Sequence, residues 1–165
     1  MNFEEMLKSS GGFKGLFEIL RDNGLSVELE LEKFLQHESG LFSIAKFSIT
    51  KMRDGYSELS FPNSHNISRH GGIVHGGIIS YALDNAGGIA VMTKNQGIDQ
   101  VTIDLNINFL KPLKKEPYIA IGRVLRHGRT ISVAEAEIHD GEGVLCAKAL
   151  GTWFLILEQR GEKES

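Results

Sequence analysis

The residues of this chain that could do chemistry are a His-Gly-Gly run and a carboxylate that follows it. His75, Gly76 and Gly77 stand just before a strongly apolar segment, and Asp84 lies within that segment. The first N–H groups of a helix have no intrahelical acceptor, and glycine lets a carbonyl approach them closely. Such amides stabilise the negative charge that develops in a tetrahedral intermediate. The alternative is that the two glycines only permit a tight loop-to-helix transition.

Asp84 needs an explanation of its own, because an ionised carboxylate in an apolar helix is costly unless it is solvated, paired or hydrogen-bonded. Its neighbours at helical spacing are Ser80, Tyr81, Gly87 and Gly88. This face is small and polar, so we expect Asp84 to line a cavity that admits water and substrate. The alternative is a structural aspartate bonded to Tyr81, Ser80 or a neighbouring chain.

The spacing of the two features also bears on assembly. Gly77 and Asp84 are seven residues apart, which separates them by about 10 Å along a helix axis, so they cannot both contact one carbonyl carbon. A second copy whose helix runs in the opposite direction would bring its Gly77 end to Asp84. The spacing therefore predicts two equivalent shared sites in a two-fold dimer.

The elements that must position these residues follow from hydrophobic periodicity. The segment Ile73–Thr93 is predicted to be a helix, and because it is apolar on nearly every side it belongs in a core. Residues 1–40 show apolar residues at helical steps and predict a helical extension. The remaining runs predict strands over Leu41–Ile49, Tyr56–Phe61, Val101–Phe109, Tyr118–Arg126, Thr130–His139 and Val144–Ile156. An antiparallel sheet wrapped around one helix, an α+β fold, is the economical arrangement.

Composition excludes several other classes of protein. With 165 residues, 41% of them hydrophobic, the chain suits one compact domain and is not disordered. Its 18 basic and 21 acidic residues give a net charge of -3 without a long basic block, which disfavours nucleic acid as a partner. The N-terminus is acidic and the longest apolar stretch is interrupted by charge, so we expect no membrane segment.

The cysteine and histidine content gives no sign of a metal site. Cys146 is the only cysteine, which favours a reducing compartment, the cytoplasm by default, and a buried apolar role for its side chain. His65, His70 and His75 recur every five residues, which is wrong for one face of a helix, and no metal-binding motif accompanies them.

Taken together, the motifs resemble a known family. Gly72-Ile73-Val74-His75-Gly76-Gly77, then Asp84, then the segment from Thr102 to Pro112 are similar to the hotdog-fold acyl-CoA thioesterases of the phenylacetic-acid-degradation (PaaI-like) type. The resemblance covers residues 41–157, with residues 1–40 as an N-terminal extension and residues 158–165 as a charged tail. It implies hydrolysis of an acyl-CoA to a free acid and CoA, where CoA is part of the substrate and no cofactor is required.

The resemblance also implies roles for individual residues. Asp84 matches the carboxylate that acts as general base or nucleophile, and Thr102 matches a residue that orients the attacking water. The amides of Gly76 and Gly77 would hold the oxyanion, and His75 would be an orienting hydrogen-bond residue.

Two of these positions leave alternatives open. Thr102 could instead be an ordinary residue of a polar strand face that also carries Asp104, Asn106 and Asn108. The family often has an asparagine six residues before the histidine, where this chain has Arg69. The nearby Asn66 or His65 would then have to supply the second oxyanion donor.

A basic hairpin turn is the candidate site for the CoA phosphates. Arg126, His127, Gly128 and Arg129 concentrate positive charge there, and a guanidinium can bind two phosphate oxygens at once. The alternative is ordinary solvated surface.

For assembly, the resemblance implies a homodimer at least and a homotetramer as the usual larger state. Two other functions compete with the thioesterase. A non-catalytic acyl-CoA-binding protein is disfavoured by the presence of Asp84, and a hotdog-fold hydratase or dehydratase by the lack of its His and acid motif.

Overall fold

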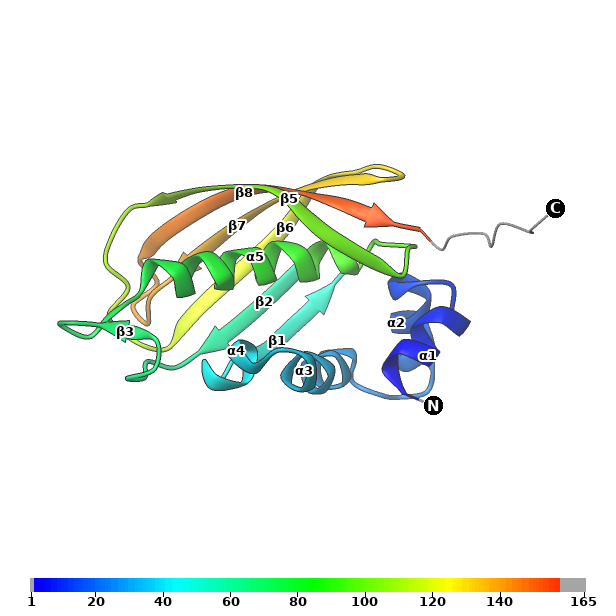
Figure 1. Cartoon of the computed structure of the whole chain (residues 1–165), viewed down its shortest axis with the longest axis horizontal. Coiled ribbons are helices and arrows are strands. Elements are labelled where there is room, and N and C mark those ends of the chain that lie inside the picture. The colour runs from blue at the N-terminus through cyan, green and yellow to red at the C-terminus, as the bar shows by residue number, and fades with distance from the viewer. Residues whose placement is uncertain (1, 158–165) are drawn as a thin grey trace.

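The computed structural model describes residues 2–157, so the predicted charged tail at 158–165 lies outside the described residues. A six-stranded antiparallel sheet curves around one long helix, as the sequence predicts (Figure 1). The helices are α1 (Phe3–Ser9), α2 (Phe13–Asp22), α3 (Val27–Glu38), α4 (Gly40–Ile44) and the central α5 (Gly76–Met92). The strands are β1 (Ser48–Arg53), β2 (Tyr56–Phe61), β3 (Ser68–Arg69), β4 (Ile73–Val74), β5 (Asp99–Phe109), β6 (Tyr118–His127), β7 (Ile131–His139) and β8 (Leu145–Ile156).

The sheet order is β1-β2-β6-β7-β8-β5, and a glycine lets α5 approach it closely. A Cβ atom on Gly122 of β6 would collide with the carbonyl oxygen of Ala86 on α5. In the same region Ser57 on β2 donates a 2.6 Å hydrogen bond to that oxygen. The middle of α5 is therefore held against the sheet by backbone contact, which fixes where Asp84 lies.

The strand predicted over Leu41–Ile49 is wrong except for its last two residues, since β1 spans Ser48–Arg53. Residues Gly40–Ile44 form α4, because the Ser39 side chain accepts a hydrogen bond from the Phe42 backbone N–H and caps the helix start. The chain then turns at Lys46, whose φ is 56°, and β1 begins at Ser48. Fully buried Phe42 packs on Phe47 with ring centroids 5.5 Å apart, and this burial fixes the turn.

The N-terminal extension shares one continuous core with the sheet. Leu16, Phe17 and Leu31 are at most 1% exposed and belong to the same buried cluster as Leu59 and Leu83. Helices α1, α2 and α3 thus contribute to the core of the domain.

Helix α3 also protects one edge of the sheet. The Glu32 carboxylate accepts a 2.9 Å hydrogen bond from the backbone N–H of Ile49, and the Glu28 carboxylate accepts one of 3.0 Å from Met52. Both donors belong to the edge strand β1, whose free N–H groups would otherwise invite pairing with another chain. At the opposite edge, β5 pairs with β8 on one side and with no other strand of the described residues.

Removing this protection should destabilise the fold. We expect Glu28→Ala with Glu32→Ala to lower the free energy of unfolding by about 2 kcal/mol, because two hydrogen bonds to partly buried N–H groups are lost. Urea unfolding measures this change, and aggregation should increase as the β1 edge opens. Glu30→Ala is the matched control, since Glu30 lies on the same helix and pairs with Lys33, on that helix as well. Equal midpoints for the double variant and the control would contradict the role of α3.

Within residues 2–157, no helix has both the length and the apolar character that a membrane span requires.

Candidate functional site

The centre of the site is a hydrogen bond between α5 and β5. The Thr102 hydroxyl donates to the Asp84 carboxylate at 2.7 Å. The two alternative partners of Asp84 are engaged elsewhere: Tyr81 bonds Ser39 at 2.9 Å, and Ser80 donates to the Gly76 carbonyl at 2.8 Å. Burial raises the pKa of Asp84, and the bond from Thr102 lowers it in part. The result is a carboxylate that is more basic than an exposed one.

Thr102 does not share a face with Asp104, Asn106 and Asn108, so that alternative is wrong. Thr102 pairs with Trp153 across β8, whereas Asp104 pairs with Thr152, and the pairing register shifts between these two positions. This β-bulge inserts one extra residue and turns the following side chains to the other face. It therefore aims Thr102 at α5, which strict alternation along the strand would not predict.

The glycines near Asp84 also differ from the expectation. Gly87 and Gly88 are buried against Trp153, where a Cβ atom on Gly87 would lie 2.5 Å from the indole ring. The prediction that they open the Asp84 face to substrate is wrong, because they make room for tryptophan. Asp84 itself is half-buried, and Thr102, its partner on β5, is exposed.

The start of α5 holds the other half of the predicted site. The helix begins at Gly76, two residues after β4, and His75 caps it by accepting a 3.0 Å hydrogen bond from the Gly77 N–H at Nδ1. His75 is thus placed for the orienting role expected of it. Among the described residues, no acceptor faces the Gly76 N–H. Of the two amides, Gly76 is the one available to an outside oxygen.

These two halves lie on one helix but do not meet within one chain. Gly76 and Asp84 are eight residues apart on α5, about 12 Å along its axis. The separation predicted from the sequence is therefore retained.

The loop before α5 places Arg69 but not Asn66 beside the helix start. Arg69 on β3 lines one groove together with Gly76, Phe109 and Lys111. Asn66 is exposed and does not line this groove. Of the residues considered for the position of the family asparagine, Arg69 itself is the one beside Gly76.

The basic turn lies at the other end of α5. His127 is close to Lys94, which follows the last turn of that helix, and burial together with this ammonium lowers the pKa of His127. Arg126 and Arg129 are both exposed there. Within one chain the turn is therefore remote from Gly76, and its role in phosphate binding stays a prediction.

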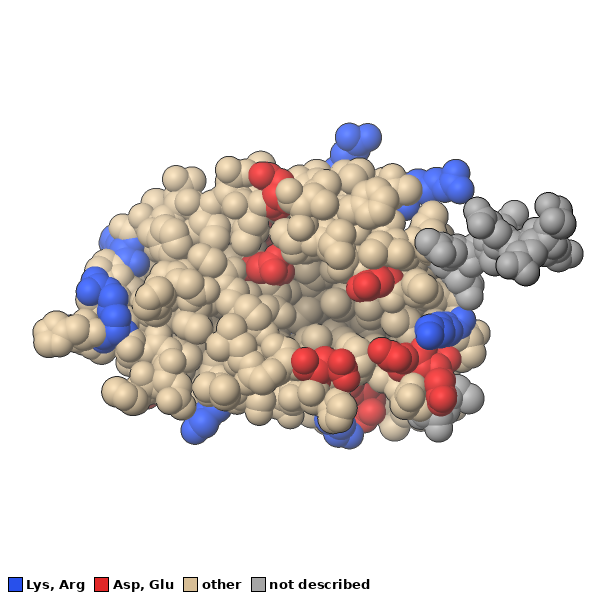
Figure 2. All heavy atoms as spheres, in the orientation of Figure 1, with Lys and Arg blue, Asp and Glu red and all other residues tan. Residues whose placement is uncertain are grey.

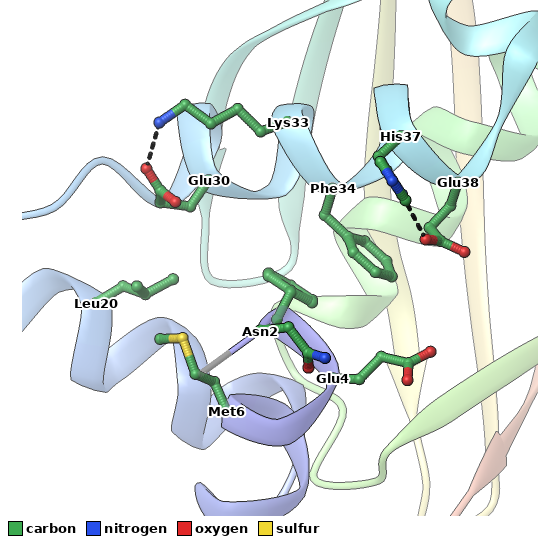
Figure 3. Close-up of a pocket in the computed structure, with 10 residues that line it drawn as sticks. Asn2, Glu4, Met6, Leu20, Glu30, Lys33, Phe34, His37 and Glu38 are labelled. Carbon is green, nitrogen blue, oxygen red and sulfur yellow. Dashed lines mark hydrogen bonds and ion pairs between the residues drawn. The ribbon is translucent and has the colours of Figure 1, made fainter.

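A separate pocket, not anticipated from the sequence, lies among α1, α2 and α3 (Figure 3). Phe3 and Phe34 stack in it with centroids 4.3 Å apart. Its other lining residues are Asn2, Glu4, Met6, Leu20, Glu30, Lys33, His37 and Glu38. With three carboxylates and one lysine it does not suit an anion, and none of the predicted site residues lines it.

Three His, Cys, Asp or Glu side chains positioned to hold a metal ion are not found among residues 2–157. Cys146 is buried, as predicted, and burial raises the pKa of its thiol. It is not placed as a nucleophile.

Comparison with known proteins identifies the family. The Thioesterase superfamily profile matches residues 71–147, the segment that holds α5 and its active-site candidates. A Saccharolobus solfataricus protein named "Putative esterase" is 38% identical over 126 residues, which cover 76% of this chain and 90% of that relative. The chain belongs to the thioesterase superfamily. Hydrolysis of a thioester is accordingly the class of activity that its relatives support.

Two further comparisons are with a solved structure and with a named thioesterase. The crystal structure of a thioesterase from Haemophilus influenzae matches with a TM-score of 0.72 and 23% identity, over 82% of this chain and 96% of that chain. This match confirms the hotdog fold. A protein of Escherichia coli named medium/long-chain acyl-CoA thioesterase YigI is 32% identical over 97 residues, covering 50% of this chain and 63% of that protein. Membership in the PaaI-like type stays a prediction.

Proposed function

We propose that this protein is an acyl-CoA thioesterase, which hydrolyses an acyl-CoA to a free acid and CoA. The observation that carries the proposal is the hydrogen bond from Thr102 to Asp84, a carboxylate in the middle of an apolar helix whose pKa is raised by burial. The name of the YigI relative supports CoA as the thiol. Colorimetric detection of free thiol released from acyl-CoAs tests the activity. No release from short, long and aromatic acyl-CoAs would contradict it.

In this mechanism Asp84 acts as general base. Its carboxylate takes a proton from water while the water oxygen bonds to the thioester carbonyl carbon. The raised pKa of Asp84 brings it closer to neutral pH, where a general base works best. The tetrahedral intermediate then collapses, the C–S bond breaks, and the CoA thiolate leaves and takes the proton held by Asp84, which returns the carboxylate to its starting form.

We assign the oxyanion to the Gly76 amide. Its N–H stands at the positive end of the α5 dipole, which favours the negative oxygen of the intermediate. The Gly77 N–H is bonded to His75 and instead orients the first turn of the helix.

A complete site requires a second copy of the chain, because Gly76 and Asp84 are too far apart on one helix. The second copy would bind at the free edge of β5. Val101, Ile103 and Phe109 are 45%, 56% and 56% exposed there, which is unusual for an edge without protection. The edge at β1, in contrast, is covered by α3.

The direction of β5 supports a shared site. It runs beside α5 in the opposite sense, so Thr102 contacts Asp84 while Phe109 lies near Gly76. If two copies of β5 pair antiparallel about a point between Thr102 and Phe109, the Asp84 end of each chain meets the Gly76 end of the other. A homodimer is thus the minimum active unit, and a homotetramer would be a dimer of this unit.

Thr102 provides a test of the base. Thr102→Val removes the hydrogen bond that lowers the pKa of Asp84, so that pKa rises. The acid limb of the kcat/KM profile, where activity falls as Asp84 is protonated, should move to higher pH. Thr102→Ser, which keeps the hydroxyl, should stay close to wild type. An acid limb at the same pH in Thr102→Val would exclude Asp84 as the titrating base.

A further inference from the structure

One groove contains both the Gly76 amide and two cationic side chains. Its apolar part includes Ile73, Phe109 and Leu110, and the cations are Arg69 and Lys111. A second hollow adjoins it and shares Arg69. That hollow is lined by Asn63, Ser64, His65, Ser68, Arg69, His70 and Gly72.

The backbone holds this region in a fixed position relative to α5. β3 and β4 pair Arg69 with Ile73, and the His75 N–H donates to the Ile67 carbonyl at 2.8 Å. The Val74 N–H donates to the Leu113 carbonyl at 3.0 Å, two residues beyond Lys111. Both cationic residues are therefore anchored to the segment that starts the catalytic helix.

Hydrogen bonds within the loop hold the side chains of the hollow in place and leave one hydroxyl group unpaired. The Asn63 amide donates to the Gly72 carbonyl at 3.3 Å and accepts from the Ser68 hydroxyl. The Ser64 hydroxyl oxygen is buried and has no partner among the described residues. Arg69 and Lys111 form no side-chain hydrogen bond or ion pair with the described residues, so their charges are free for a ligand.

The charge distribution over the surface also favours an anionic ligand at this groove. Figure 2 shows Lys and Arg side chains at the end of the molecule that carries β3, whereas Asp and Glu side chains gather over α1 and α3, with Lys and Arg side chains beside them. The Glu116 carboxylate reaches this loop and accepts a 2.5 Å hydrogen bond from the Asn63 N–H. An anionic group would meet a favourable potential at Arg69 and an unfavourable one at the acidic pocket.

We propose that the groove of Arg69 and Lys111, with the adjoining Ser64 hollow, binds the phosphates of the CoA portion of the substrate. This inference rests on the proposed function. The thioester carbonyl would sit at Gly76, the apolar part of the groove would take the pantetheine arm, and the phosphates would reach Arg69. Gly72 of the hollow is four residues from Gly76, at most about 14 Å of extended chain, so one chain supplies both contacts.

Arg69 suits this task because its guanidinium can bind two phosphate oxygens in a bidentate manner, and Lys111 adds a second positive charge. Arg69 stands where the resemblance implies an asparagine, and the pantetheine arm would separate its phosphate contact from the oxyanion donor at Gly76. The basic turn at Arg126 and Arg129 is the competing location, at the opposite end of α5.

The test compares two thioesters of the same acid, acyl-CoA and acyl-pantetheine, which lacks the nucleotide phosphates. Arg69→Ala with Lys111→Ala should raise KM for acyl-CoA about tenfold or more and leave kcat within about twofold, since remote phosphate contacts bind ground and transition states alike. KM for acyl-pantetheine should not change. Lys8→Ala with Arg21→Ala is the matched control, because it also removes one lysine and one arginine, from exposed positions on α1 and α2.

Calorimetric titration with CoA alone separates the two proposals. If the wild type hydrolyses acyl-CoA and the Arg69/Lys111 variant keeps the wild-type KM and CoA affinity, the phosphate site is overturned and the function stands. If no thioester is hydrolysed but CoA binding weakens about tenfold in that variant, the function fails and the site stands. A KM increase in Arg126→Ala with Arg129→Ala, and none in the Arg69/Lys111 variant, would also overturn this proposal.

Discussion

Replacing Asp84 with asparagine should lower kcat for acyl-CoA hydrolysis by about two orders of magnitude or more, the size of effect expected when a general base is removed. The asparagine side chain would keep the size of the aspartate and an acceptor for Thr102, but it could not take a proton from water. Stopped-flow or colorimetric thiol release measures the loss.

The same variant should not lose stability. Burial raises the pKa of Asp84 in the folded chain, so the folded state binds a proton more tightly than the unfolded one, and stability falls as pH rises through the pKa of the folded state. At neutral pH the carboxylate therefore opposes folding, and Asp84→Asn should have a Tm equal to or above that of the wild type. Near-wild-type turnover in a folded Asp84→Asn protein would rule out this mechanism.

The matched control is Asp104→Asn, the same chemical change on β5. The Asp104 carboxylate accepts a 2.6 Å hydrogen bond from Asn106 and lies on the sheet face away from α5, beyond the bulge. Its replacement should leave kcat near the wild-type value. Equal losses in the two variants would mean that general changes of charge, and not proton transfer, explain the effect.

Mixing two inactive variants should restore activity if each site is shared between chains. One variant is Asp84→Asn and the other is Gly76→Pro, which removes the free amide. A mixed dimer would have one site with both defects and one with neither. With random exchange at equal amounts about half the dimers are mixed, so activity should recover to about a quarter of wild type per site.

Gly76→Pro is a mild way to delete this N–H. Gly76 is the first residue of α5, the helical position where proline is best tolerated. His75 has φ -61° and ψ 136°, the extended conformation that a residue before proline prefers. Gly76→Ala is the control, because its Cβ would contact Phe109 at 3.6 Å while the N–H remains.

Failure of rescue has a defined meaning. Heterodimers that form, as shown by native mass spectrometry, and remain inactive would exclude a site shared between chains. So would a monomer with the full activity of the wild type.

Much of the site can be predicted from the sequence because its parts are local. The amides of Gly76 and Gly77 and the position of Asp84 belong to one apolar helix, and His75, for which an orienting hydrogen bond is predicted, directly precedes it. The distance along that helix also indicates from the sequence that one chain cannot complete the site. Strands β2 and β5 to β8 follow from alternation of apolar residues, and their observed bounds differ from the predicted ones by few residues. The short strand β3 is not predicted, and β4 (Ile73–Val74) replaces the start of the helix predicted over Ile73–Thr93.

What the tertiary structure alone decided depends on contacts between distant segments. The bulge that aims Thr102 at Asp84 arises from pairing with β8, and no local pattern in the strand reveals it. In the sequence, Gly87 and Gly88 indicate an open face beside Asp84. In the structure, Trp153, a residue far along the chain, packs on both glycines. Likewise, α4 replaces a predicted strand because Phe42 is buried in a core that distant residues build. Local sequence determines which backbone conformations have low free energy, and long-range packing selects among them.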